Sequence, residues 1–124
     1  MYQRVLLKIS GEALSSENAV ICSDTVQQTV SHLKALWEKG IQIGVVVGGG
    51  NIMRGRSAEG MERNRADHMG MLATAINALA LQDALERAGV PCAVQSAVDM
   101  DRFCDSYSAR SEEHTSELQS HLNL

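Results

Sequence analysis

The groups best suited to chemistry in this sequence are a lysine, two glycine turns and an arginine. Residues 48–50 are three consecutive glycines at the end of an apolar run, residues 41–47, and Arg54 follows them. Because glycines carry no Cβ, their backbone N–H groups can approach an anion closely, and the guanidinium of Arg54 can bind phosphate oxygens. A plain glycine turn beside a solvated arginine would show the same pattern. The triple glycine therefore indicates a phosphate site only together with its neighbours.

The second candidate group is Lys8, which lies inside the apolar run 4–10 and is followed by Ser10 and Gly11. A buried lysine is costly unless its charge is paired, so we expect Lys8 at the carboxyl end of a strand, where open α/β sheets bind ligands. Ser10 and Gly11 would form the first phosphate-side turn. The alternative is an edge-strand lysine that discourages aggregation. A lysine, small-residue turns and an arginine suit phosphoryl transfer, which depends mostly on positioning and charge neutralisation.

The elements that must position these groups are predicted to form a βαβ unit. Both apolar runs read as strands, and the valines at 45–47 favour a strand buried on both faces. Between the runs we predict a helix with Ser23 or Asp24 as its cap and Gly40 as its stop. Its apolar residues recur at helical spacing, at Val26, Val30, Leu33 and Trp37. The two strands should therefore be parallel, with a right-handed crossover.

A long helix is predicted from His68 to Arg87. It is apolar nearly all round, so we expect one face to pack on the sheet and another to meet a second subunit. Asp67 stands just before it and either accepts hydrogen bonds from a ribose diol or caps the helix; its spacing leaves both open. Residues 92–98 read as a third strand, and residues 104–108 as the approach to another helix.

Composition restricts the classes of function. The 124 residues are 44% hydrophobic and 21% charged, as in one modest soluble domain, and neither a bilayer-length apolar stretch nor a signal peptide is recognisable. We therefore expect a cytoplasmic protein without membrane contact. A net charge of −4, with one tryptophan, two tyrosines and one phenylalanine, argues against nucleic-acid binding. The cysteines (Cys22, Cys92 and Cys104) and the four histidines show no metal-ligand spacing, so no protein-built metal site is predicted.

Two common nucleotide-binding motifs are absent. The sequence contains no G-x-x-x-x-G-K-[ST] pattern, and the glycine run does not fit G-x-G-x-x-G because Met53 stands where the third glycine belongs. Any phosphate site here is thus of another kind.

Four segments, in matching order and spacing, carry a resemblance to a known family. Residues 6–14 (LLKISGEAL), 44–55 (GVVVGGGNIMRG), 67–73 (DHMGMLA) and 104–108 (CDSYS) resemble the bacterial UMP kinases, or uridylate kinases, of the amino-acid-kinase superfamily. The resemblance implies an α/β fold, a three-layer αβα sandwich with a mainly parallel central sheet. It implies that residues 1–109 form the N-terminal, UMP-binding (acceptor) lobe.

The same resemblance implies an activity and its residues. Bacterial UMP kinases transfer the γ-phosphate of ATP to UMP, giving UDP in pyrimidine nucleotide biosynthesis. Lys8 would be catalytic, stabilising the transition state. ATP phosphates would be bound by Lys8, Ser10, Gly11, Gly50 and Arg54, and UMP by Gly49 and Asp67. Mg²⁺ would arrive bound to ATP. The resemblance also implies that GTP activates the enzyme, that UTP inhibits it, and that the enzyme assembles as a hexamer.

The sequence departs from the family at its C-terminal end. Family members continue with a helix, further strands, a Gly-Thr-Gly-Asn-type uridylate loop and an ATP lobe, none of which occurs in these 124 residues. Residues 110–124 are polar and resemble the translation of a sequencing-library adapter, so we expect a non-native or disordered tail.

Two other functions stay open for this chain. We expect the chain alone to be inactive, which makes a non-catalytic lobe that binds uridylate or dimerises one alternative. A superfamily kinase acting on a carboxylate or carbamate is the other, disfavoured by the matches at 67–73 and 104–108.

Overall fold

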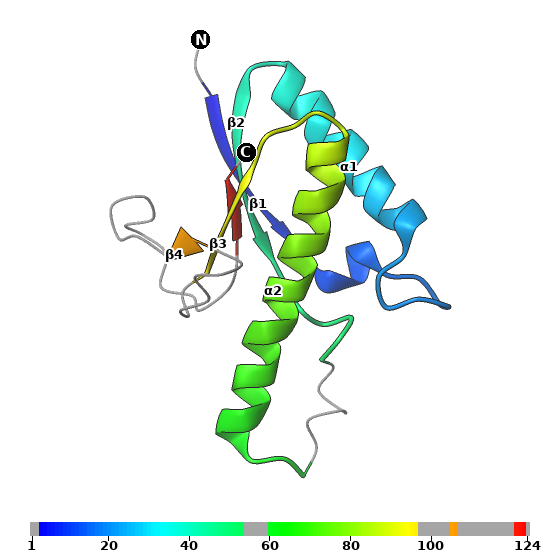
Figure 1. The fold of residues 1–124 in the computed structure, drawn as a ribbon, viewed down its shortest axis with the longest axis vertical. Coiled ribbons are helices and arrows are strands. Elements are labelled where there is room, and N and C mark those ends of the chain that lie inside the picture. The colour runs from blue at the N-terminus through cyan, green and yellow to red at the C-terminus, as the bar shows by residue number, and fades with distance from the viewer. Residues whose placement is uncertain (1–2, 54–59, 97–104, 107–120, 124) are drawn as a thin grey trace.

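A computed structural model describes residues 3–53, 60–96, 105–106 and 121–123 of the chain. Strands and helices alternate through most of this length (Figure 1). The elements are β1 (Gln3–Ile9), the 3₁₀ helix η1 (Gly11–Leu14), α1 (Ser23–Glu38), β2 (Ile41–Val47), α2 (Arg63–Arg87), β3 (Ala93–Ser96), β4 (Asp105–Ser106) and β5 (His121–Asn123).

The strands form one sheet in the order β1-β2-β5-β3-β4. β1 and β2 are parallel and paired over their whole length, from Gln3 opposite Ile41 to Ile9 opposite Val47. β3 and β4 are also parallel, whereas β5 runs antiparallel to β2 and to β3. The predicted α/β fold and its parallel βαβ unit, β1-α1-β2, are confirmed.

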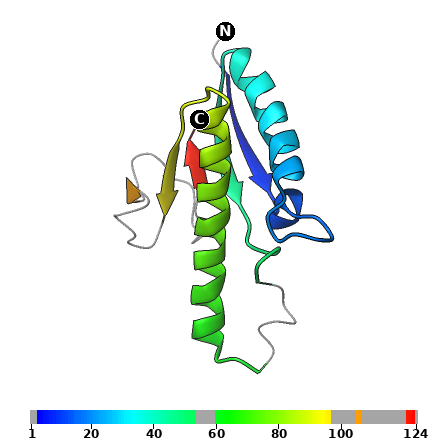
Figure 2. The same cartoon turned by 45° about the vertical axis from the view of Figure 1, so that its right-hand side comes forward.

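Both long helices pack on the same face of the sheet (Figures 1 and 2). Because side chains alternate along a strand, β1 and β2 each turn every second residue toward these helices. The core cluster joins residues of β2, α1 and α2, including Ile43, Val45 and Val47 of β2, Val30 and Leu33 of α1, and Leu81 and Leu85 of α2. Leu7 and Ile9 of β1 pack against this cluster.

The second face of the sheet is open in the described part of the chain. Val45 and Val47 are fully buried, but Val46 between them is only half-buried, and Leu6 on β1 is 64% exposed. The prediction that residues 45–47 are buried on both faces is therefore wrong, because no described helix covers that side. Of the expected three layers, the described residues supply the sheet and one helix layer.

The helix α1 buries the predicted stripe of Val26, Val30 and Leu33. Its cap is Cys22 rather than Ser23 or Asp24, and the Thr25 hydroxyl donates to the Cys22 carbonyl oxygen at 2.9 Å. The chain reverses after α1 through Gly40, whose φ of 84° lies in the region that glycine adopts without strain.

The helix α2 begins at Arg63, earlier than the predicted His68, and ends at the predicted Arg87. Its C-terminal part packs on the sheet, while its N-terminal part extends past the sheet (Figures 1 and 2). Met69, Leu72 and Ile76 are accordingly exposed, by 39%, 53% and 48%. Neither α2 nor any other described helix has the length and apolar content needed to cross a membrane.

The C-terminal part of the sequence differs from expectation. Asp105–Ser106 form the short strand β4, where residues 104–108 were predicted to approach a helix. His121–Asn123, within the predicted tail 110–124, form β5 between β2 and β3. Residues 107–120 and 124 lie outside the described residues, and the origin of the tail stays a prediction.

Candidate functional site

The two glycine turns lie side by side at one edge of the sheet. Because β1 and β2 are parallel and in register, Ile9 and Val47 end their strands together. The chain then leaves β1 through Ser10 and Gly11, and the amide of Gly48 donates to the Ile9 carbonyl oxygen at 2.9 Å. This pairing brings the two predicted phosphate turns together at the carboxyl ends of the strands, where α/β sheets bind ligands.

The contact between the turns requires a glycine at position 11. A Cβ on Gly11 would overlap the Oδ1 atom of Asn51 and lie 2.9 Å from the amide nitrogen of Gly50. Real Cβ atoms essentially never approach backbone this closely. Gly11 is therefore needed for the close approach of the turns, in addition to any role toward a ligand.

Gly49 is held against α2 in the same way. A Cβ on Gly49 would lie 2.9 Å from the Cβ of Ala73 and 3.3 Å from the carbonyl oxygen of Gly70. The loop then closes on itself, since the amides of Ile52 and Met53 donate to the Gly49 carbonyl oxygen at 3.0 and 2.9 Å. The glycine loop is thus a tight turn clamped between η1 and α2.

Two buried asparagines contact the glycine loop and were not predicted as functional residues from the sequence. Asn51 is 6% exposed and Asn77, on α2, is 0% exposed. The Asn77 amide nitrogen donates to the Gly48 carbonyl oxygen at 2.8 Å and to Asn51 Oδ1 at 2.7 Å. The available signal was Asn77 itself, a polar residue among the alanines and leucines of an otherwise apolar helix segment.

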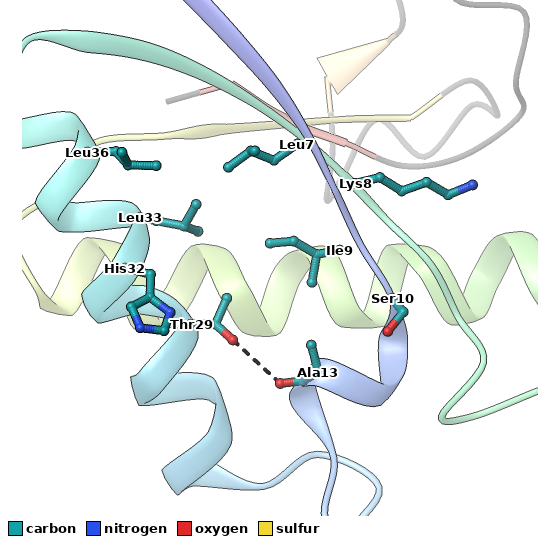
Figure 3. Close-up of a pocket in the computed structure, with 9 residues that line it drawn as sticks. All are labelled: Leu7, Lys8, Ile9, Ser10, Ala13, Thr29, His32, Leu33 and Leu36. Atoms are coloured by element: carbon teal, nitrogen blue, oxygen red, sulfur yellow. Dashed lines mark hydrogen bonds between the residues drawn. The ribbon is translucent and has the colours of Figure 1, made fainter.

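Lys8 lies near the carboxyl end of β1, as predicted, and its side chain is exposed on the open face of the sheet. Figure 3 shows its ammonium pointing away from α1, opposite to Leu7 and Ile9. β1 is also the edge strand of the described sheet, as the alternative interpretation of Lys8 requires. The position of Lys8 therefore agrees with both interpretations.

A pocket of about 390 Å³ lies on the other side of β1, between this strand and α1 (Figure 3). Most of its lining is apolar, and the Thr29 hydroxyl donates to the Ala13 carbonyl oxygen at 3.5 Å across one end. The residues that line this pocket are Leu7, Lys8, Ile9, Ser10, Ala13, Thr29, His32, Leu33 and Leu36. An apolar lining does not suit a phosphate, so we place the candidate anion site at the turns.

Asp67 lies within α2 rather than before it. The helix starts at Arg63 with Glu62 at the cap position, so the prediction that Asp67 could cap the helix is wrong. Residues three and four apart share a helix face, which puts Asp67 one turn from Gly70, whose carbonyl oxygen lies beside Gly49. Asp67 is exposed there. Arg54, the remaining predicted ligand, lies outside the described residues.

The two described cysteines, Cys22 and Cys92, have opposite electrostatic environments. The backbone N–H of Thr25, with smaller contributions from Ser16 and Asp24, lowers the pKa of Cys22, although the Cys22 side chain makes no capping hydrogen bond. Burial, reinforced by the charge of Glu86, raises the pKa of Cys92 to about 11. In residues 3–53 and 60–96 we find no group of three or more metal-ligating side chains.

Comparison with known proteins identifies the family. The sequence profile described as "Amino acid kinase family" matches residues 3–123. The chain belongs to the amino acid kinase family.

Among solved structures, the chain is similar to the UMP kinase from Ureaplasma parvum, with 36% identity and a TM-score of 0.84 over 91% of this chain and 50% of that one. It is also similar to the UMP kinase from Bacillus anthracis, with 31% identity and a TM-score of 0.84 over 90% of this chain and 48% of that one. The predicted resemblance to UMP kinases and the predicted fold are confirmed. The chain spans about half the length of these solved kinases.

Proposed function

We propose that this chain forms the UMP-binding part of a UMP kinase, which transfers the γ-phosphate of ATP to UMP and yields UDP. The observation that carries the proposal is the adjacency of the turn at Gly11 and the loop at Gly48, at the carboxyl ends of two parallel strands. The identity of 36% and 31% to solved UMP kinases supports uridylate over other acceptors.

The backbone of the turns would bind the phosphates. Gly49 would contact UMP, while Ser10, Gly11 and Gly50 would contact ATP, with N–H groups as donors to phosphate oxygens. Two phosphate-binding turns in contact would hold donor and acceptor phosphates near each other. Positioning of this kind is the main contribution that a protein makes to phosphoryl transfer.

The charged side chains would neutralise and orient the substrates. The Lys8 ammonium would stabilise negative charge on the transferred phosphoryl group, and Arg54 would bind ATP phosphates. The Asp67 carboxylate, one helical turn from the Gly49 contact, would accept hydrogen bonds from the UMP ribose. Mg²⁺ would arrive bound to ATP and reduce the charge on its phosphates.

The remaining proposals rest on the resemblance to bacterial UMP kinases. They are activation by GTP, inhibition by UTP, assembly as a hexamer, and a role in pyrimidine nucleotide biosynthesis in the cytoplasm. A binding-only role for the chain itself is the second candidate, favoured by its span of 50% and 48% of the solved UMP kinases.

Titration calorimetry with an assay of ADP formation tests the proposal on the 124-residue chain. We expect UMP to bind more tightly than uridine, because the turns bind the phosphate, and we expect no UMP-dependent ADP formation. Failure to bind UMP, with binding of a small carboxylate instead, would contradict the uridylate assignment. Robust ADP formation would overturn the assignment of the chain to the acceptor part alone.

A further inference from the structure

Asn51 and Asn77 form a reciprocal amide pair behind the glycine loop. Each side-chain amide nitrogen donates to the other residue's Oδ1, at 2.7 Å from Asn77 and 3.1 Å from Asn51. The second N–H of Asn77 donates to the Gly48 carbonyl oxygen at 2.8 Å, and that of Asn51 donates to the Val20 carbonyl oxygen at 2.8 Å. All four amide N–H donors of the pair are therefore used.

The hydrogen bonds determine how both amides are oriented. If the Asn77 amide were turned over, its oxygen would face the Gly48 carbonyl oxygen, and two acceptors would meet without a proton. The same holds for Asn51 against the Val20 carbonyl oxygen. Because both asparagines are buried, either mismatch would leave unsatisfied polar atoms away from water. The pair therefore has one arrangement.

This arrangement sets the direction of the Gly48–Gly49 peptide. In a trans peptide the C=O and the N–H point in opposite directions, and the structure contains no cis peptide bond in its described part. Asn77 holds the Gly48 carbonyl oxygen toward α2. The N–H of Gly49 then points away from α2.

The pair also fixes the spacing of the two turns. The Oδ1 atom of Asn51 occupies the space that a Cβ on Gly11 would need. Asn51 thus lies in contact with the Gly11 turn, the glycine loop, the 15–22 loop at Val20, and α2 through Asn77.

We propose that Asn51 and Asn77 are positioning residues that hold the glycine loop and the Gly11 turn in their phosphate-binding geometry. This inference rests on the proposed function for its ligand, but the geometry of the loop can be measured without one. The pair acts through Gly48 and Gly11 and need not touch substrate.

The test replaces Asn77 by aspartate in the 124-residue chain. Asn77→Asp keeps the shape of the side chain, removes both N–H donors, and sets a carboxylate against the Gly48 carbonyl oxygen and Asn51 Oδ1. Asn64→Asp is the matched control, since it makes the same change at an exposed position of the same helix. Asn77→Ala, which adds no charge, is measured in parallel in case the aspartate variant does not fold.

The first readout is amide hydrogen exchange followed by NMR. The loop amides of Gly48, Ile52 and Met53 are hydrogen-bonded to backbone, and Val30 and Leu33 report on α1. We expect the loop amides of the Asn77 variants to exchange about tenfold faster, as loss of a buried hydrogen bond predicts, with α1 unchanged. If amide exchange became faster by the same factor in α1 and in the loop, the asparagine pair would merely stabilise the core. That result would overturn the proposal.

The second readout is UMP affinity by calorimetry, corrected for the folded fraction. We expect the Asn77 variants to bind UMP about tenfold more weakly than the parent chain and the Asn64 control. Unchanged UMP affinity or unchanged loop exchange in a folded Asn77 variant would overturn the positioning role while leaving the proposed function intact. If the parent chain does not bind UMP, the proposed function fails, and hydrogen exchange still decides whether the pair positions the loop.

Discussion

Gly49 and Ala73 are in such close contact that a Cβ on Gly49 would stand 2.9 Å from the Cβ of Ala73. The loop that we propose to bind UMP is therefore seated directly on α2. The geometry of the glycine loop therefore depends on α2, a helix that begins only at Arg63.

Gly49→Ala should consequently displace the loop. We expect a loss of about 1–3 kcal/mol in the free energy of unfolding in urea, as for overpacked sites, and a clear loss of UMP affinity in calorimetry. Gly70→Ala is the control: nothing lies within 4 Å of its Cβ position, and alanine in a helix should stabilise by about 0.5–1 kcal/mol. A Gly49→Ala chain that keeps both stability and UMP affinity would contradict the close contact.

Lys8 should matter for catalysis and not for folding. It is exposed and points away from the core-facing side of β1, so Lys8→Met should change the free energy of unfolding by no more than about 0.5 kcal/mol. In a protein that joins this sequence to a complete ATP-binding half, the same change should lower kcat by about 10²–10³, with a smaller effect on KM for UMP. Lys39→Met, at the exposed C-terminus of α1, is the control. A kcat like that of the parent would remove Lys8 from the mechanism.

Cys22 and Cys92 should react with thiol reagents at different rates. Because the pKa of Cys22 is lowered and that of Cys92 is raised to about 11, Cys22 holds more thiolate near neutral pH. Iodoacetamide should therefore label Cys22 faster than Cys92, as followed by peptide mass spectrometry. The rate at Cys92 should keep rising as the pH is raised toward 11, while the rate at Cys22 levels off earlier. Faster labelling of Cys92 at neutral pH would contradict the assigned environments.

The exposed face of α2 should mediate self-association. Met69, Leu72 and Ile76 recur at helical spacing and are exposed, which is typical of a helix that packs against a partner. We expect oligomers at micromolar concentration in sedimentation velocity, and mainly monomers for Leu72→Glu. Ala35→Glu, on the exposed side of α1, should leave the oligomers unchanged. A parent chain that sediments only as a monomer would count against the prediction.

Sequence patterns sufficed for the local parts of this protein. The helical spacing of Val26, Val30 and Leu33 reflects burial of one face, and the structure buries that face. The helical crossover through α1 implies parallel strands, and β1 and β2 are parallel. Parallel pairing in turn brings Gly11 and the loop at 48–50 to one edge, so the core of the candidate site follows from the order of elements alone.

The tertiary structure decided what depends on partners far apart in the chain. Asn51 and Asn77 are 26 residues apart, and neither belongs to a periodic pattern that would predict the bond. The half-buried Val46 and the position of β5 between β2 and β3 depend on which segments cover or join the sheet. Local propensity and spacing indicate which face of an element is apolar. Only the packed chain shows which groups meet across it, because a buried polar atom takes whatever partner the fold brings within reach.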